Sequence, residues 1–321
     1  MGDIRLSTSS CRLPLNSANI FDLRKVKCLD HSTTPETVKH RLSAYAELIT
    51  ISFAQTPMIS IGLGLLCSSE ISPSQNNLSM ITLAFAFVGM VLVLAHIMVI
   101  NDYFDVEIDK KKDQIQTLTE IPRRVAGVLA TVFLGLGLLF AWLTSATYFI
   151  ISLALALLSA AYSAPPIRYK QVYPFSTMGE ATGAFLLFWA GYSLSAPLDV
   201  RAILVSFIPF LVLVVWRLKH EIRYVEFDKD TGKKTLAVVH GVHRVKLLVS
   251  FCYLSIVALT MGLFFGGWFS TTFLLFLVIF LGLVSLVSIS SSARTLWNKA
   301  LAKYYWGFAY FFAVAAWILF S

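Results

Sequence analysis

Apolar residues in this chain come in blocks of about 20, the length that an α-helix needs to cross a hydrocarbon core of roughly 30 Å. Polar connections separate the blocks, alternating between short ones and long ones such as 101–124 and 217–245. The pattern predicts nine membrane spans, at 46–69, 78–100, 125–144, 146–163, 178–196, 200–217, 246–267, 271–291 and 302–320. Residues 1–44 lack such a block and are predicted to form a largely disordered cytoplasmic tail, and residues 45–321 a single all-α transmembrane domain.

Composition excludes a soluble globular protein. Hydrophobic residues make up 57% of the chain and charged residues 14%, and the mean hydropathy is +0.73. A soluble domain carries about 25% charged residues. The four cysteines lie far apart without a CxxC spacing, so neither a disulfide framework nor a zinc site is indicated.

Basic residues are distributed by membrane side. All of the 26 Lys and Arg except Arg201 fall in the N-terminal segment or in every second connection between spans. Such a bias places the basic connections and the N-terminus in the cytoplasm, and the C-terminus on the opposite side. The net charge of +8 therefore reports topology and attraction to membrane lipid, and no nucleic-acid partner is expected.

A cluster of acidic residues begins where the second span ends. Asp102, Asp105, Asp109 and Asp113 follow a helical spacing that puts their carboxylates in one stripe, and Asn101 adds a neutral oxygen. Stacked like charges disfavour a helix unless a cation compensates them. Oxygen ligands at this density suit Mg²⁺, which typically bridges carboxylates to phosphate oxygens. An ordinary solvated loop would explain the polarity but not the one-sided stripe.

A second acidic segment follows the sixth span. Glu221 and Asp228 are seven residues apart and are predicted to share one face of a helix. Basic residues are interleaved with them, namely Arg223, Lys229, Lys233 and Lys234. The segment is either the second half of a metal site or a salt-bridged surface helix.

A third segment closes the fourth span and carries the sequence Tyr-Ser-Ala-Pro-Pro-Ile-Arg-Tyr-Lys over residues 162–170. The two prolines end the helix. Arg168 and Lys170 then lie at the cytoplasmic surface, where they either hold a diphosphate or anchor the helix end in the lipid headgroups.

Together the three segments resemble the UbiA superfamily of intramembrane prenyltransferases. The first matches that family's Asn-Asp-x-x-Asp-x-x-x-Asp motif. In the second, Glu221 stands in the first Asp position of the family's second motif and Asp228 in the last. The Tyr-Ser-x-Pro-Pro-x-Arg-x-Lys stretch is similar to relatives in quinone and chlorophyll pathways. The resemblance covers about residues 45–321.

The resemblance implies nine helices around a central cavity, with cytoplasmic Asp-rich connections. It implies two Mg²⁺ ions, a prenyl diphosphate donor and transfer of the prenyl group to a small aromatic or quinone-precursor acceptor. The implied metal ligands are Asn101, Asp102, Asp105, Asp109, Glu221 and Asp228. The implied substrate-binding residues are Lys112, Ser163, Arg168, Lys170, Arg223 and Lys233. Asp102, Asp105 and Tyr162 are the implied catalytic residues, with the ring of Tyr162 facing the diphosphate or the cation.

The chain also departs from the family pattern. It lacks the Asn-Lys-Pro-x-Arg-Pro run that follows the first motif in many relatives, so Lys112, Arg123 or Arg124 would substitute for the usual arginine. Glu221 is one methylene longer than the usual Asp. These departures leave the acceptor open.

Alternatives to prenyl transfer remain. A UbiA-type terpene cyclase would ionise the same donor without an external acceptor. A cation-coupled transporter is disfavoured because its acids would lie near the membrane midplane within repeats. An inactive, lipid-binding relative is also compatible with the substituted positions. His96 and Glu180, at membrane depth, are either functional groups or packed and hydrogen-bonded.

Overall fold

The fold is taken from a computed structural model, which describes residues 55–70, 78–110, 123–290 and residue 314. All of them belong to one compact unit, His40–Ser321. The predicted boundary at residue 44 and the ninth predicted span, 302–320, lie outside the described residues.

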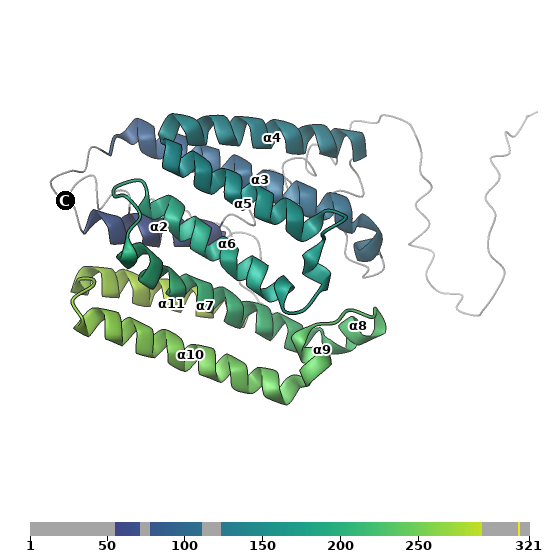
Figure 1. The fold of residues 1–321 in the computed structure, drawn as a ribbon. Coiled ribbons are helices and arrows are strands. Elements are labelled where there is room, and N and C mark those ends of the chain that lie inside the picture. Colours follow the sequence, from purple (N-terminus) through teal and green to yellow (C-terminus); the bar gives the residue numbers. More distant parts are fainter. Residues whose placement is uncertain (1–54, 71–77, 111–122, 291–313, 315–321) are drawn as a thin grey trace, which may run out of the picture. The chain divides into compact units, whose positions relative to one another are not determined.

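Every long element of the described part is a helix (Figure 1). The longer helices are α2 (Gln55–Ser69), α3 (Met80–Lys110), α4 (Arg123–Thr144), α5 (Ala146–Ser163), α6 (Phe175–Tyr192), α7 (Val200–Arg223), α10 (Val242–Phe265) and α11 (Thr271–Ser290). The short ones are η3 (Tyr169–Gln171), α8 (Val225–Asp230) and α9 (Leu236–His240). The prediction of an all-α chain is confirmed.

Five of these helices are long and apolar enough to cross a membrane, namely α3, α4, α5, α7 and α10. Helix α2 contains a shorter apolar stretch, Pro57–Ser69. The predicted spans 178–196 and 271–291 overlap α6 and α11. The structure thus supports a multi-pass membrane protein, while the count of nine spans stays a prediction.

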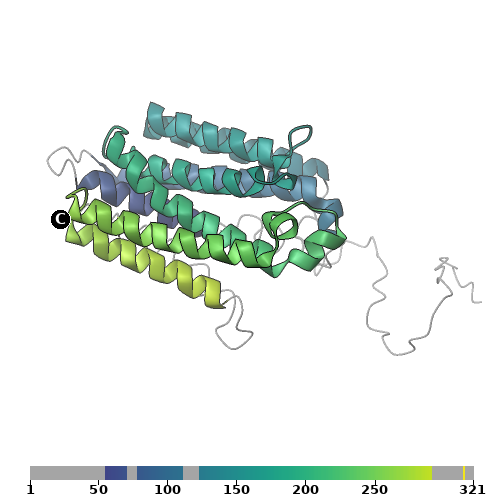
Figure 2. The same cartoon turned by 60° about the horizontal axis from the view of Figure 1, so that its bottom comes forward.

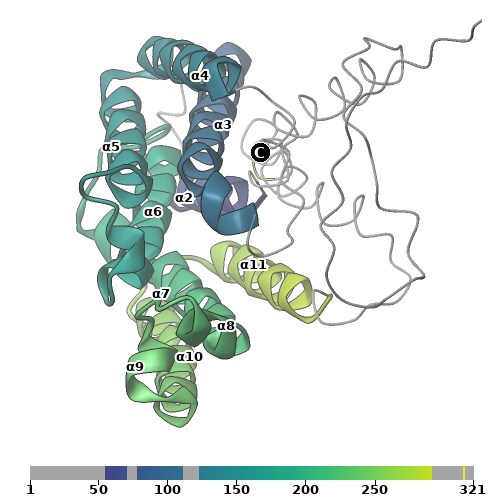
Figure 3. The same cartoon turned by 90° about the vertical axis from the view of Figure 1, so that its right-hand side faces the viewer.

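Neighbouring helices run alongside one another (Figures 1 and 2). Helix α3 packs on α4 and α5, helix α6 packs on α2, α5 and α7, and α7 packs on α10, as the view along the helices shows (Figure 3). Helices α2 and α6 cross so closely that Gly64 and Gly191 leave no room for a side chain between their backbones. Small residues at such crossings are typical of membrane helices.

Buried ionisable residues away from the acidic motifs are explained by local contacts. His96 Nδ1 lies 2.9 Å from the carbonyl oxygen of Ala130, which favours the interpretation of His96 as a packed, hydrogen-bonded residue between α3 and α4. Arg201, the exception to the charge distribution, pairs with Glu70 at 3.3 Å. Glu70 also accepts a hydrogen bond from the Ser270 amide at 3.1 Å. This cluster joins the end of α2 to the start of α7 and to the residue before α11.

Candidate functional site

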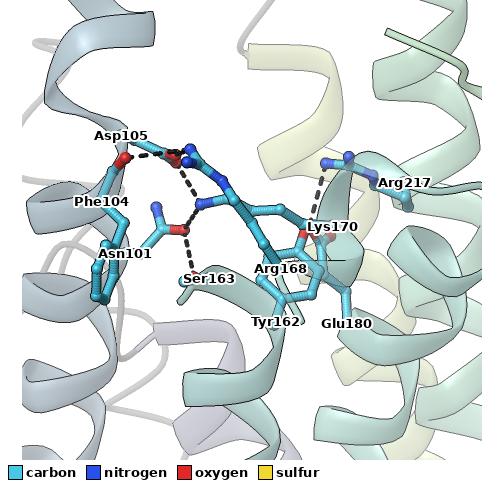
Figure 4. Close-up of polar contacts among 9 residues, drawn as sticks. All are labelled: Asn101, Phe104, Asp105, Tyr162, Ser163, Arg168, Lys170, Glu180 and Arg217. Atoms are coloured by element: carbon cyan, nitrogen blue, oxygen red, sulfur yellow. Dashed lines mark hydrogen bonds and ion pairs between the residues drawn. The ribbon is translucent and has the colours of Figure 1, made fainter. Parts of the chain in front are cut away.

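Two basic side chains converge on Asp105 near the end of α3. Arg168 Nη2 donates to Asp105 Oδ1 at 2.8 Å and to the carbonyl oxygen of Phe104 at 3.1 Å. Lys170 Nζ donates to Asp105 Oδ2 at 2.6 Å (Figure 4). Both oxygens of this carboxylate therefore face cations from the connection between α5 and α6. Charge-assisted contacts of this kind are short and strong.

Asn101 lies one turn before Asp105 on the same helix and binds the same segment. Its Oδ1 accepts from Lys170 Nζ at 2.9 Å and from Ser163 Oγ at 3.0 Å. Arg168 has a left-handed backbone, with φ of 36°, a conformation that costs a non-glycine residue about 1 kcal/mol or more. The surrounding contacts hold this strained turn, and the turn presents both Arg168 and Lys170 to α3.

Tyr162, the last residue but one of α5, connects this cluster to the helices on its other side. Its hydroxyl donates to Glu180 Oε1 on α6, and Arg217 Nη1 on α7 lies 3.1 Å from the same oxygen (Figure 4). Lys170 Nζ lies 5.9 Å from the centroid of the Tyr162 ring. The ring of Tyr162 thus already carries a cation near one face.

The second acidic motif divides between two helices. Glu221 belongs to α7 and Asp228 to α8, and Tyr224 breaks the helix between them with φ of −107° and ψ of 16°. The prediction that Glu221 and Asp228 share one helical face is therefore wrong, because it assumed a continuous helix. Asp228 is buried, and its side chain lies 3.9 Å from Lys233 Nζ.

Glu221 is 1% exposed, and protein donors surround its carboxylate. Thr177 Oγ1 donates to Oε1 at 3.0 Å, and the Leu236 amide donates to Oε2 at 2.9 Å. Arg217 Nε lies 3.8 Å from Oε1, one turn earlier on α7. Glu221 therefore joins α6, α7 and α9.

A backbone contact links the two connections that carry the remaining basic residues. Val172 and Lys234 form an isolated parallel β-bridge. The bridge sets Lys233, the neighbour of Lys234, beside the segment that carries Arg168 and Lys170. Val172 and Lys234, 62 positions apart in the sequence, are thus brought together at one end of the described helices.

The other predicted site residues are placed as follows. Asp102 is partly buried on α3, and Arg223 is exposed at the end of α7. The side chain of Asp109 and the whole of Lys112 lie outside the described residues. Within the described part, no group of three or more His, Cys, Asp or Glu side chains is close enough to hold a metal ion.

The donor set still fits a Mg²⁺ ion paired with a diphosphate. Carboxylate and amide oxygens on α3 are the ligand type that Mg²⁺ prefers. The Nε of Arg168 is buried and makes no hydrogen bond within the described ranges, so one donor is left for a further acceptor. An anionic oxygen beside Arg168 would satisfy it.

The sequence did not predict a role for Thr177 or Arg217, and it left two interpretations of Glu180, as a functional group or as a packed residue. Thr177 carries no charge, and its role arises from a contact across 44 sequence positions. Arg217 did have a signal, because it is a charged residue at the end of an apolar span, one turn before Glu221. Its contact with Glu180 required the packing of α6 on α7.

Comparison with known proteins places this chain in a family. Residues 58–313 match the model of the UbiA prenyltransferase family. The chain belongs to the UbiA prenyltransferase family. It is accordingly a prenyltransferase of the UbiA type and an integral membrane protein, as the resemblance implied.

Named relatives of this UbiA-family protein differ in their activities. The chain is 24% identical over 242 residues to a protoheme IX farnesyltransferase of Acinetobacter baylyi, covering 71% of this chain and 80% of that protein. It is 33% identical over 190 residues to a digeranylgeranylglyceryl phosphate synthase of Methanoregula boonei, covering 56% and 65%. It is 28% identical over 204 residues to a 4-hydroxybenzoate octaprenyltransferase of Pseudomonas fluorescens, covering 60% and 66%.

Solved structures agree on the fold. The UbiA homolog from Archaeoglobus fulgidus bound to GPP and Mg²⁺ superposes with a TM-score of 0.66 at 19% identity, covering 86% of this chain and 99% of that one. At this identity the likeness establishes the helical fold.

The position of the segment that carries Arg168 and Lys170 can be tested by a substitution at Gly179. A Cβ at Gly179 would lie 2.4 Å from Cε2 of Tyr169, which stands between Arg168 and Lys170. Burial and then the charge of Glu180 raise the pKa of the Tyr169 phenol, which remains a donor to the Leu158 carbonyl oxygen at 3.1 Å. Gly179→Ala should displace Tyr169 and lower turnover about tenfold to a hundredfold without unfolding the protein.

Gly183→Ala is the matched control, one turn further along α6. Its Cβ would meet only Leu155 Cδ1, at 3.9 Å. Turnover and thermal unfolding in nanodiscs should be measured for both variants. Equal activity of the Gly179 and Gly183 variants would show that Tyr169 does not position the basic segment.

Proposed function

We propose that this protein catalyses Mg²⁺-dependent transfer of an isoprenoid chain from an allylic prenyl diphosphate to a small aromatic or quinone-precursor acceptor. The convergence of Arg168 and Lys170 on Asp105 carries the proposal, because it joins an acidic, metal-type motif to two phosphate-type cations. The Archaeoglobus homolog bound to GPP and Mg²⁺ supports the same pairing of ligands.

The proposed metal ligands are Asn101, Asp102, Asp105, Asp109 and Asp228, whereas protein donors enclose Glu221, the sixth predicted ligand. Their oxygens would hold two Mg²⁺ ions at the membrane surface, supported by the spacing on α3. Bound Mg²⁺ would withdraw charge from the departing diphosphate and so ease cleavage of the allylic C–O bond.

The basic residues of this chain would bind the diphosphate itself. Arg168, Lys170 and Lys233 lie on two connections that the Val172–Lys234 bridge holds together. Arg168 Nε offers a buried donor, and Ser163 Oγ lies beside Asn101 at the end of α5. Lys112 and Arg223 are proposed to contact the same anion. Preorganised donors of this kind stabilise charge that develops on the leaving group.

Tyr162 would act on the allylic chain of the donor. When the C–O bond breaks, its electron pair leaves with the diphosphate and a positive charge remains on the allylic chain. The Tyr162 ring, which has a lysine ammonium 5.9 Å from its centroid, is suited to lie against that charge. An acceptor carbon then bonds to the allylic carbon, and the acceptor releases a proton to solvent.

The acceptor class rests on the relatives' names and on the resemblance. One relative acts on 4-hydroxybenzoate by its name, and another is named for protoheme, so the acceptor varies within the family. The orientation proposed here, with the N-terminus and the site on the cytoplasmic side, rests on the distribution of Lys and Arg.

Removal of the metal gives the direct test. Purified protein in nanodiscs is incubated with labelled geranyl, farnesyl or geranylgeranyl diphosphate, with Mg²⁺ or EDTA, and with or without 4-hydroxybenzoate. We expect diphosphate release to fall by about a hundredfold or more in EDTA and to return when Mg²⁺ is restored.

Products distinguish transfer from cyclisation. A prenylated acceptor supports the proposal, whereas a cyclic hydrocarbon or alcohol formed without an acceptor would identify a terpene cyclase. No release from any donor, with Mg²⁺ and acceptor present, would refute the proposed reaction.

A further inference from the structure

Glu221 occupies a metal-ligand position by resemblance, but its surroundings differ from those of a metal ligand. Its carboxylate accepts from Thr177 on α6 and from the Leu236 amide at the start of α9. A guanidinium, that of Arg217, lies within ion-pair distance. Two of these partners are a buried threonine and a backbone amide, whereas the partners of Asp105 are the phosphate-type cations Arg168 and Lys170.

Burial argues in the same direction. The Glu221 side chain is 1% exposed, whereas the side chains of Asp228 and Asp105 are 6% and 15% exposed. Mg²⁺ loses its waters reluctantly and usually keeps several of them when it binds protein carboxylates. A carboxylate enclosed by a threonine, a backbone amide and an arginine leaves little room for a hydrated ion.

The length of the side chain explains the departure from the family pattern. Glu221 reaches from α7 to the Leu236 amide, a contact between residues 15 positions apart on two elements. An Asp would end one methylene earlier, about 1.5 Å short of that amide. The extra methylene therefore has a use in reaching α9.

We propose that Glu221 is a positioning residue, which fastens the start of α9 to α6 and α7 and does not ligate Mg²⁺. The segment that it holds continues directly from Lys233 and Lys234, and Lys234 pairs with Val172 of the basic connection. Glu221 thereby sets the distance between Lys233 and Arg168. The consequence for turnover rests on the proposed function, whereas the fastening of α9 does not.

Two substitutions of Glu221 distinguish a positioning residue from a Mg²⁺ ligand. One removes the charge and keeps the length, and the other keeps the charge and removes the length. Glu221→Gln keeps the length and one oxygen acceptor but removes the charge, which a positioning residue tolerates and a Mg²⁺ ligand does not. Glu221→Asp restores the family's residue and keeps the charge but shortens the reach. We expect the Asp variant to lose about tenfold to a hundredfold in turnover, and the Gln variant to stay within about fivefold of the unaltered protein.

Metal binding supplies a readout independent of turnover. Mn²⁺ binding is followed by electron paramagnetic resonance, with a non-hydrolysable geranyl thiolodiphosphate present. Mn²⁺ affinity should stay within about threefold in both Glu221 variants and fall about tenfold or more in Asp228→Asn. Glu226→Gln is the matched control on α8, since that side chain is 79% exposed and pairs with Lys229.

Hydrogen exchange of the Leu236 amide tests directly whether Glu221 holds the start of α9. Hydrogen exchange of the Leu236 amide should accelerate in Glu221→Asp and stay slow in Glu221→Gln, and Thr177→Val should accelerate it to a smaller extent. Unchanged exchange in the Asp variant, or a tenfold loss of Mn²⁺ affinity in the Gln variant alone, would overturn the inference. If the unaltered protein binds no Mn²⁺, the proposed metal site fails, and Leu236 exchange alone still decides the role of Glu221.

Discussion

Asp105→Asn is expected to reduce turnover about a thousandfold, the largest effect of any single isosteric change in this protein. The carboxylate accepts from Arg168 at 2.8 Å and from Lys170 at 2.6 Å. An Asn in its place can present an oxygen to only one of them. Its amide nitrogen would then face a second donor, and the proposed metal site would lose a negative charge.

The loss in turnover should be larger than the loss in stability can explain. Asp105 lies near the C-terminal end of α3, at the last residue of its apolar span, and its side chain is partly exposed. Size-exclusion profiles of Asp105→Asn should match those of the unaltered protein, whereas its stability should fall by about 3 kcal/mol because Arg168 and Lys170 lose their common partner. Single-turnover diphosphate release measures the effect, with Glu226→Gln as the control for removing an acid. A variant that keeps more than a tenth of the activity would exclude Asp105 from the ionising step.

The all-helical membrane fold could be predicted because it depends on local signals. A block of apolar residues specifies a span by length alone, and α3, α4, α5, α7 and α10 follow from such blocks. Helix α3 runs without a break from Met80 to Lys110, so the predicted placement of Asp102 and Asp105 on one helix holds. The spacing of the motif was sufficient for that conclusion.

Contacts between distant segments could not be predicted in the same way. The sequence placed Arg168 and Lys170 at the membrane surface, but their pairing with Asp105 depends on the turn at Arg168, where φ is positive. No residue type at position 168 signals such a turn. The motif likewise predicted that Glu221 is a metal ligand. In the structure, the Glu221 carboxylate accepts hydrogen bonds from donors on α6 and α9.

The break at Tyr224 shows how one residue alters a site. A continuous helix would place Glu221 and Asp228 two turns apart on one face. The structure ends α7 at Arg223 and begins α8 at Val225, so the two acids point from different helices. Tyr224 has no strong preference against helix, and the break reflects the packing of α8 and α9 against α7.

Gly64→Ala and Gly191→Ala are each expected to destabilise the protein by about 3 kcal/mol and to abolish monodisperse protein when combined. A Cβ on Gly64 would lie 2.0 Å from the Phe188 carbonyl oxygen, and one on Gly191 would lie 1.9 Å from the Ile61 carbonyl oxygen. The obstructing atoms are backbone, so no rotamer change can relieve the clash. Helices α2 and α6 would have to separate.

Separating α2 from α6 would lose more packing energy than the contacts at the two glycines provide. Phe188 and Ile61 are buried at the same crossing, and membrane helices associate largely through such close packing because lipid offers no hydrophobic drive between them. Gly135→Ala on α4 is the matched control, since its Cβ would meet nothing within 4 Å. Thermal unfolding in one detergent should show Gly135→Ala close to the unaltered protein and both crossing variants about 5 °C or more below it. Equal unfolding temperatures for all three would mean that α2 and α6 do not approach as closely as their backbones indicate here.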